Sequence, residues 1–379
     1  MNFDLNPDQE MLRETVSKWL GKNYTFEDRN SIIKAGGFST EIWKNMSELG
    51  LMGLAVPEEY GGMDFGPVEA MLVMEQLGQS LVLEPYADVA LIAAGLLRDH
   101  AAASIKQTWL PGLANGLLKV VLAHVEYGSR YDLAFTQARA HQKEDAWLVS
   151  GRKSVVPLGD QVDAFIVPAI AHNDGSNIGI SLFLVERPAV GVTTWGYSQQ
   201  DGARAAEVSL NNAPATLLVG ETLGLAALEH AVDIGIAALC AQAVGAMDAL
   251  FAMTVEYLNT RKQFGVPIGT FQALRHRIAD VKIQIELARS MSYLATLKLR
   301  EDSVSRRRAL SAAKVQLGHS MRFVGQQCIQ MHGGIGMTQE YAAGHYFKRL
   351  TCIELSFGDT LHHLAEVSAR MQDTAGVFN

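Results

Sequence analysis

The sequence predicts an α+β protein with a helical N-terminal domain, a middle β domain and a C-terminal helical bundle. Apolar residues recur at helical spacing in the first part of the chain, and short apolar or alternating runs separated by turn residues follow. Helical periodicity returns from Glu221 onward. From these three observations we expect domains at residues 1–118, 119–218 and 219–379.

Start and stop signals place the helices of the N-terminal domain. Asn6-Pro7-Asp8 predicts one helix start and Ser39-Thr40 predicts another. Gly50 is expected to end the second helix in a left-handed conformation. The proline and paired glycines of residues 57–62 predict a loop, and a further helix is expected at about 66–79.

The middle domain is expected to consist of short strands. Apolar or alternating runs bounded by turn residues, such as Asn173-Asp174-Gly175, are typical of β structure. The predicted strands are residues 119–124, 146–149, 164–167 and 180–185.

The C-terminal part contains a helix with an apolar stripe at alternating steps of four and three residues. This spacing is typical of an antiparallel helix bundle. The stripe consists of Leu274, Ile278, Val281, Ile285, Ala288, Ser292, Ala295 and Leu299.

Composition and charge restrict the partners and the compartment. The net charge of −8 argues against a nucleic-acid partner, which would need a basic face. Cys240, Cys328 and Cys352 form no CxxC pair, so we expect reduced thiols in the cytosol. No signal peptide is recognisable, and no uninterrupted apolar run approaches the roughly 20 residues of a membrane span. We therefore expect a cytoplasmic protein.

Two segments of the C-terminal part suit a cofactor that carries phosphate. The first is Arg261-Lys262-Gln263-Phe264-Gly265, whose arginine can bind two phosphate oxygens in a bidentate manner. In Gln330-Met331-His332-Gly333-Gly334-Ile335-Gly336 the glycines let backbone amides approach a pyrophosphate closely. A helix-ending turn would use the same glycines, and this alternative stays open.

These segments resemble the acyl-CoA dehydrogenase family, as do residues 48–53, residues 57–62 and Phe271-Gln272. The resemblance covers nearly the whole chain. It implies the family fold, with an N-terminal helical domain, a middle β-barrel or sandwich domain and a C-terminal four-helix bundle. It also implies FAD as cofactor, an acyl-CoA thioester as substrate, an electron-transferring flavoprotein as electron acceptor and a dimer or tetramer.

The same resemblance assigns one set of residues to the pyrophosphate and adenine side of FAD. In the family these elements act across a subunit interface, on the flavin that a neighbouring subunit holds. The set consists of Arg261, Gln263, Phe264, Gln330, Gly333, Gly334, Gly336 and Thr360.

The catalytic base is missing from both positions at which the family has it. Desaturation removes a proton from Cα with a positioned carboxylate and a hydride from Cβ with the flavin. The usual position of the carboxylate is Gly358 in this chain, and the position used by a minority of the family is Gly235. Asp359 is the first remaining candidate for the base, ahead of Glu354 and Asp233. A shift of one residue normally points a side chain elsewhere, and the alternative is an aspartate that caps backbone amides.

The middle domain departs from the family pattern on the side of the flavin ring. Of the family's flavin loop, only Gly128-Ser129 and Glu126 are kept. Gly151-Arg152-Lys153 is kept from a second element, but Val155 and Pro157 replace a tryptophan and a threonine. Because proline supplies neither a hydroxyl nor an amide donor, we expect this chain's own flavin-ring pocket to be impaired.

These departures predict a subunit that lacks a base and completes the FAD site of a paralogous catalytic subunit. Residues 332–341 and 344–349 resemble the small subunits of heteromeric acyl-CoA dehydrogenases, of the pimeloyl-CoA dehydrogenase type. Such enzymes act on dicarboxylic, long or polycyclic acyl-CoAs. Two alternatives stay open. One is a self-sufficient homo-oligomer that uses Asp359 or another base, and the other is a binding or structural homologue without a redox role.

Two further clusters carry little weight. His362-His363 with Glu366 lacks the spacing of a helical metal motif, so no metal site is expected. Arg306-Arg307-Arg308 is typical of a solvated helix face or a helix start, and a contact with a CoA phosphate is the alternative.

Overall fold

The computed structural model describes residues 4–144, 146–173 and 176–371. Contacts group these residues into two units, each of which is described by itself. The first unit holds residues 4–31, 67–82 and 236–371, and the second holds the described residues of 32–66 and 83–235. Because this grouping interleaves segments of the chain, the domain bounds 1–118, 119–218 and 219–379 stay a prediction.

The second unit begins with short helices. The Ser39 hydroxyl accepts a hydrogen bond from the Ile42 amide, which confirms the predicted helix start, and Gly50 has the expected left-handed φ of 78°. The later helices of this unit carry no such start signal, and sequence reasoning did not resolve them. The helical segments are α3 (Thr40–Glu48), η1 (Leu51–Gly53), η2 (Glu58–Tyr60), η3 (Ala87–Ala93), α5 (Ala94–His100) and α6 (Ala103–Ala114).

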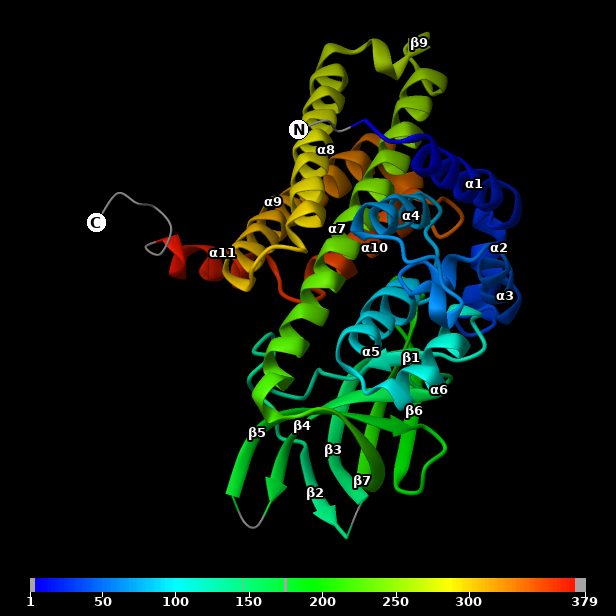
Figure 1. Cartoon of the computed structure of the whole chain (residues 1–379). Helices are drawn as coiled ribbons and strands as arrows, with labels where there is room; N and C mark the ends of the chain where they lie inside the picture. The colour runs from blue at the N-terminus through cyan, green and yellow to red at the C-terminus, as the bar shows by residue number, and fades with distance from the viewer. Residues whose placement is uncertain (1–3, 145, 174–175, 372–379) are drawn as a thin grey trace. The chain divides into compact units, whose positions relative to one another are not determined.

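The same unit contains a seven-stranded sheet (Figure 1). Its strands are β1 (Val120–Leu122), β2 (Arg139–Lys143), β3 (Ala146–Pro157), β4 (Ala164–Asn173), β5 (Ser176–Glu186), β6 (Val192–Ser198) and β7 (Arg204–Val219). β4 pairs with β2 and β5, β2 pairs with β3, and β7 pairs with both β3 and β5. These strands close into a ring, to which β1 adds beside β4 and β6 beside β7. The middle part of the chain is therefore a barrel.

The predicted strands are found in or around β1, β3, β4 and β5, whereas β2, β6 and β7 were missed. β2 has the sequence RAHQK, and four of its five residues are exposed. β6 is also mostly exposed, so neither strand shows a clear apolar alternation. The predicted turn Asn173-Asp174-Gly175 lies in part outside the described residues.

The first unit consists mainly of helices. The Asn6 side chain accepts from the Gln9 amide while the Gln9 side chain accepts from the Asn6 amide, which confirms the predicted start of the first helix. The helices are α1 (Pro7–Asn23), α2 (Phe26–Lys34), α4 (Pro67–Gln79), α7 (Glu221–Thr260), α8 (Gln272–Lys298), α9 (Ser303–His332), α10 (Ala343–Leu355) and α11 (Thr360–Ala369); α2 and α7 continue into the second unit. Short segments are β8 (Lys262–Gln263), β9 (Val266–Pro267), η4 (Ile268–Thr270) and η5 (Gly333–Met337).

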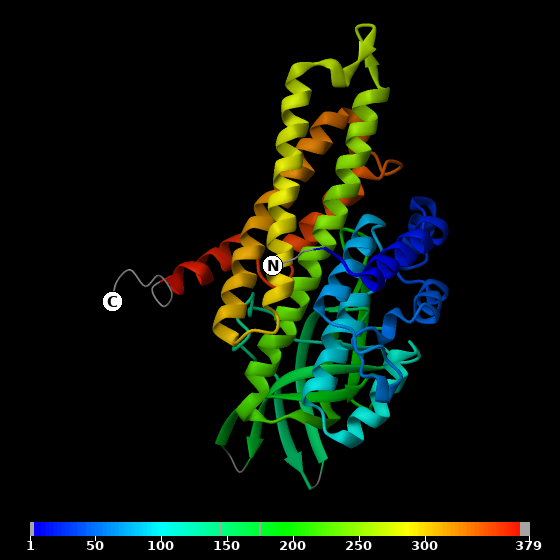
Figure 2. The ribbon, with the colours of Figure 1, turned by 45° about the horizontal axis from the view of Figure 1, so that its top comes forward.

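The C-terminal helices form the predicted bundle. Figures 1 and 2 both show α7, α8 and α9 as long helices that run side by side. The predicted stripe is buried from Val281 in α8 to Leu299, which follows the last residue of that helix, whereas Leu274 and Ile278 are half-buried.

The backbones of α4 and α7 touch where the two helices cross. A Cβ atom built on Gly78 would overlap the carbonyl group of Gln242, and one built on Gly245 would overlap that of Glu75. Both obstacles are helix backbone, which cannot rotate away as a side chain can. The crossing therefore requires glycine at both positions.

Within the described residues, α7 is the one helix that is long and apolar enough to cross a membrane by length and composition. Its most apolar window has a mean hydropathy of 1.7 and is 78% buried inside the protein. Burial of this extent is what the core helix of a globular protein shows.

We expect Gly245→Ala to destabilise the protein by about 3 kcal/mol, because the added methyl group meets immobile backbone. Denaturant unfolding would measure the change. Gly21→Ala in α1 is the matched control, since nothing lies within 4 Å of its Cβ position. That control should stabilise the helix by up to about 1 kcal/mol. Equal effects of the two substitutions would contradict the close crossing.

Candidate functional site

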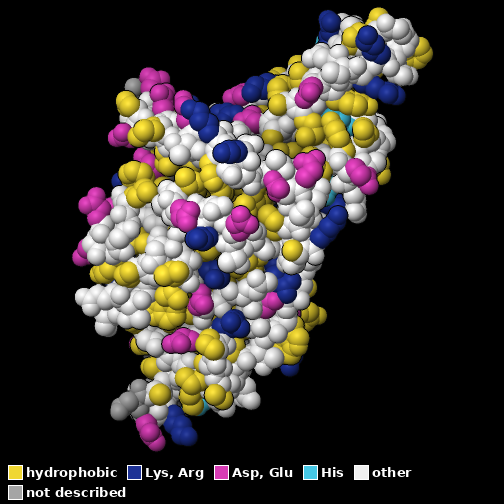
Figure 3. All heavy atoms as spheres, turned by 90° about the vertical axis from the view of Figure 1, so that its right-hand side faces the viewer, with side chains coloured by type: hydrophobic (Ala, Val, Ile, Leu, Met, Phe, Trp, Pro, Cys, Tyr) yellow, Lys and Arg dark blue, Asp and Glu magenta, His cyan; other side chains and the backbone are white. Residues whose placement is uncertain are grey.

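The first predicted cofactor segment lies at the tip of the hairpin between α7 and α8. Arg261 follows the last residue of α7, and β8 pairs with β9 in a short turn. Arg261, Gln263 and Phe264 are all exposed, and Phe264 is 93% exposed. Figure 3 shows Lys or Arg side chains beside hydrophobic ones at the upper end, where this hairpin lies. These groups are therefore accessible to another molecule.

The second predicted segment lies at the end of α9. Gly333 ends this helix with a φ of 63°, and a Cβ atom built on Gly333 or Gly334 would meet nothing within 4 Å. Gln330 is exposed, whereas Gly336 is buried. The glycines thus form a helix-ending turn and also leave an open backbone surface, so the two interpretations of this motif are compatible.

His332 connects the two segments, a role that sequence reasoning missed. Its Nε2 atom lies 3.1 Å from the hydroxyl group of Thr254, and its ring packs against those of Tyr257 and Tyr341. Thr254 and Tyr257 belong to α7, and the Arg261 amide donates to the Tyr257 carbonyl. Burial lowers the pKa of His332 to about 4. A neutral imidazole therefore packs the end of α9 against the end of α7.

The turn at the usual base position contains a helix cap. Phe357 and Gly358 have positive φ values of 56° and 113°. The Oδ1 atom of Asp359 accepts a hydrogen bond of 2.8 Å from the His362 amide and thereby caps α11. This geometry supports the capping interpretation of Asp359 over the catalytic one.

Thr360 and Lys314 hold the other side of this turn. The Thr360 hydroxyl and amide both donate to the Glu354 carboxylate, at 2.7 and 3.1 Å. The Lys314 ammonium donates to the carbonyls of Ile353, Glu354 and Ser356, and burial lowers its pKa to about 8. Thr360 is buried and has an internal acceptor, so its contact with a cofactor stays a prediction.

The second base position also lacks a side chain. Gly235 is buried within α7 and belongs to the second unit. Neither Gly235 nor Gly358 can accept a proton through a side chain.

Glu126 and Lys153 are kept from the two segments with which the family contacts the flavin, and in the barrel they form a buried ion pair. The Lys153 ammonium donates to the Glu126 carboxylate at 2.6 Å and to the Pro168 carbonyl at 2.8 Å, and the two side chains are 0% and 3% exposed. Glu126 also accepts from the amides of Gln137 and Ala138. Burial lowers the pKa of Lys153 to about 8, and the charge of Glu126 opposes this shift. Both retained residues therefore act within the barrel.

The replaced residues offer no polar side chain to a flavin ring. Val155 lies at an irregularity in the pairing of β3 with β7, has a φ of 53° and is 47% exposed. Its amide is 3.4 Å from the Glu207 carboxylate, which also accepts from the Tyr197 hydroxyl. Pro157 pairs with Ala205 of β7.

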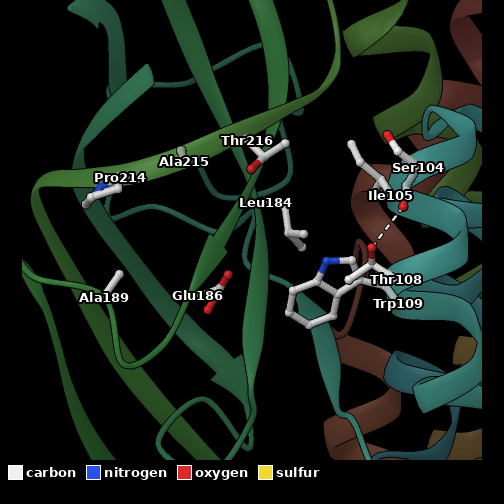
Figure 4. Close-up of a pocket in the computed structure, with 10 residues that line it drawn as sticks. All are labelled: Ser104, Ile105, Thr108, Trp109, Leu184, Glu186, Ala189, Pro214, Ala215 and Thr216. Atoms are coloured by element: carbon white, nitrogen blue, oxygen red, sulfur yellow. Dashed lines mark hydrogen bonds between the residues drawn. The ribbon is translucent and has the colours of Figure 1, made fainter. Parts of the chain in front are cut away.

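A hollow of about 480 Å³ lies between α6 and the strands β5 and β7 (Figure 4). The Trp109 ring extends from α6 toward Leu184, and the Glu186 side chain lies on the strand side. None of the ten residues that line this hollow belongs to the predicted site.

The histidine pair and the arginine cluster singled out in the sequence lie in helices. No group of three or more His, Cys, Asp or Glu side chains that could hold a metal occurs in the described part of the chain. His362 and His363 pack edge to face, with ring centroids 5.0 Å apart. Residues 306–308 lie in the first turns of α9.

Two family descriptions match the chain. "Acyl-CoA dehydrogenase, N-terminal domain" covers residues 6–117, and "Acyl-CoA dehydrogenase, C-terminal domain" covers residues 223–372. The probable acyl-CoA dehydrogenase YngJ of Bacillus subtilis (strain 168) is 30% identical over 368 residues, which are 94% of this chain and 96% of that protein. The chain belongs to the acyl-CoA dehydrogenase family.

Two solved structures are similar to this family member over its whole length. A chain of a variant of the Tcur3481-Tcur3483 steroid ACAD is 27% identical with a TM-score of 0.88, and the match covers 97% of this chain and 99% of that one. A chain of the structure named Electron transferring flavoprotein of Acidaminococcus fermentans is 26% identical with a TM-score of 0.90, and the match covers 100% of both. The acyl-CoA dehydrogenases are FAD-dependent flavoproteins that oxidise CH–CH bonds of acyl-CoA thioesters and typically form oligomers.

The residues of this acyl-CoA dehydrogenase family member suit one side of FAD and not the other. The open backbone at Gly333 and Gly334 and the exposed Arg261 suit the pyrophosphate and adenine part. On the ring side, Val155 and Pro157 carry no polar side chain, and the polar residues Glu126 and Lys153 are bonded to each other.

We expect Lys153→Met to destabilise the barrel by about 3–5 kcal/mol, because it leaves the Glu126 carboxylate buried without its cation. Denaturant unfolding would measure this loss. Lys18→Met is the matched control, since the Lys18–Glu14 pair is 77% and 61% exposed and should contribute little. The double variant Lys153→Met/Glu126→Gln should recover part of the loss. A loss no greater than that of the control would contradict the structural role of the pair.

His363 should make the protein sensitive to acid. Burial, assisted by Lys314, His362 and Arg307, lowers the pKa of His363 to about 3, whereas the unfolded chain has the ordinary value near 6.5. Between these values the unfolded chain binds more protons, so stability falls as the pH falls from about 6.5 toward 3. Compared with His363→Gln, the native protein should lose about 1.4 kcal/mol more per pH unit in this window. Unfolding curves at pH 4 to 7 measure the difference, and parallel curves would contradict it.

Proposed function

We propose that this chain is a base-deficient subunit of a heteromeric acyl-CoA dehydrogenase and completes the FAD site of a catalytic paralogue. The proposal rests on one observation. Residues suited to the pyrophosphate and adenine side of FAD are exposed, while both positions of the catalytic base are glycine. Arg261 and the backbone of Gly333-Gly334 would hold the diphosphate of the partner's FAD. FAD supplies the acceptor for the hydride that leaves Cβ, and the partner would supply the carboxylate.

The apolar surface of the hairpin supports a subunit contact. Phe264 and Phe271 pack edge to face with centroids 6.2 Å apart, yet they are 93% and 37% exposed. Large apolar side chains that remain exposed together mark a protein interface. Further along α8, Ile283 and Leu287 are also exposed. A partner subunit that covers this surface would also approach Arg261.

The names of two structural relatives support the kind of partner and substrate. One joins two proteins, Tcur3481 and Tcur3483, and calls them a steroid ACAD. The other names an electron transferring flavoprotein. We therefore propose a two-protein enzyme that works on a bulky acyl-CoA in the cytoplasm and passes electrons to an electron-transferring flavoprotein.

The two alternatives have less support. A self-sufficient enzyme would need Asp359 or another base, and the Asp359 carboxylate caps α11. A homologue without a redox role would have no use for the exposed adenine-side groups.

We expect the chain purified alone to contain little FAD and to oxidise no acyl-CoA, because it lacks the ring contacts and the base. When it is co-expressed with a paralogue that carries the glutamate, the complex should contain one FAD per pair. Flavin absorbance and turnover with an artificial electron acceptor would measure both outcomes. One FAD per chain and normal turnover in the isolated protein would refute the proposal.

Arg261→Ala gives the same test at a single residue. In the co-expressed complex, loss of a charge-assisted bond to phosphate of about 1.5–3 kcal/mol should weaken FAD binding roughly 10- to 100-fold. Arg275→Ala is the matched control, because Arg275 is exposed in the same hairpin and bonds to the Gly269 carbonyl. Equal FAD affinity in the Arg261 variant and the native complex would remove Arg261 from the site.

A further inference from the structure

Two imidazole rings occupy the space that a side chain at residue 358 would need. A Cβ atom built on Gly358 would lie 2.5 Å from Nε2 of His363 and 2.7 Å from Cδ2 of His362. Such distances are shorter than the van der Waals contact of about 3.5–4.0 Å between carbon atoms. The backbone of Gly358 also has a φ of 113°, which residues with a side chain rarely adopt. Sterics and backbone conformation therefore both exclude a side chain here.

The His363 ring is anchored on both sides and cannot move away without losing hydrogen bonds. Its Nε2 atom lies 3.0 Å from the Phe357 carbonyl, which only accepts, so Nε2 carries the proton. Its Nδ1 atom lies 3.2 Å from the Ser311 hydroxyl on α9, which then donates. His363 is only 3% exposed, and burial keeps the ring neutral, as this arrangement requires.

The rest of the turn is held just as firmly. Lys314 binds the carbonyl groups at the end of α10, Glu354 binds the amide and hydroxyl of Thr360, and Asp359 caps α11. The Oγ1 atom of Thr360 also lies directly against Gly318 of α9, where a Cβ atom would overlap it. The turn therefore has little freedom to adopt another conformation that could present a carboxylate.

We propose that the His363 ring, with the His362 ring beside it, blocks position 358 sterically. This block prevents the chain from carrying a catalytic carboxylate at that position. The inference rests on the proposed function, which makes position 358 the site of the missing carboxylate. The inference adds that the surroundings of residue 358, and not only its missing side chain, prevent a catalytic base at this position. A glutamate restored at 358 would be directed against the two imidazoles, so this substitution alone should not restore a base.

A double-mutant cycle on the full chain tests the obstruction without reference to activity. Gly358→Ala should lower the melting temperature by several degrees in the native background and by clearly less in the His363→Ala background, because the clash with the His363 ring is then gone. The loss that remains combines the cost of a positive φ with the contact to Cδ2 of His362. Equal losses in both backgrounds would overturn the proposal. If His363→Ala does not fold, His363→Asn provides a second background with a shorter side chain and the same prediction.

Gly334→Ala is the matched control, since nothing lies within 4 Å of its Cβ position and its φ is not positive. Its effect on the melting temperature should be small and the same with and without His363. A Gly334 effect that depends on His363 as strongly as that of Gly358 would mean that the cycle reports general loosening, and would count against the obstruction.

A second experiment tests the consequence for catalysis. In the co-expressed complex the glutamate of the partner is replaced by glutamine, and Gly358→Glu is introduced here. We expect no acyl-CoA oxidation, while turnover by this complex would overturn the proposal. The two proposals fail separately. An isolated native chain that oxidises acyl-CoA refutes the proposed function, whereas additive melting temperatures refute the obstruction.

Discussion

The ion pair between Lys153 and Glu126 is the interaction on which the barrel of this chain depends. An ammonium group in the interior is tolerated only when a carboxylate and further acceptors surround it. Glu126 and the Pro168 carbonyl meet this need, and Glu126 also binds the amides of Gln137 and Ala138. The pair thus joins β3 and β4 to the segment that precedes β2. This requirement explains why Glu126 and Lys153 are kept while Val155 and Pro157 replace the residues that a flavin ring would contact.

The turn before α11 follows the same rule, that buried polar groups need hydrogen-bond partners. Lys314, Glu354 and His363 are buried or nearly so, and each finds its partners among backbone groups, Thr360 or Ser311. Buried polar groups that are satisfied in this way rigidify their surroundings. A turn that presents a catalytic carboxylate needs the opposite, a side chain that faces a substrate. The polar network of this turn is consistent with a structural role.

The groups suited to FAD differ in kind, because they are exposed. Arg261 and Phe264 lie at the end of a helical hairpin, and the glycines at the end of α9 present open backbone. His332 packs between these two helix ends and sets their separation. A surface of this kind gains a function only when another subunit covers it. A division of labour between two paralogous subunits would account for both the exposed segments and the two glycines at the base positions.

The sequence by itself determined the family, the helix starts at Asn6 and Ser39, the left-handed Gly50 and the segments suited to FAD. Those signals are local, since a cap or a motif is complete within a few consecutive residues. It also showed that positions 235 and 358 lack a carboxylate. Only the tertiary structure decided that Asp359 caps a helix, that Glu126 and Lys153 bond to each other, and that His363 fills the space beside Gly358. These contacts join side chains that packing brings together or orients, and no local pattern encodes such distances.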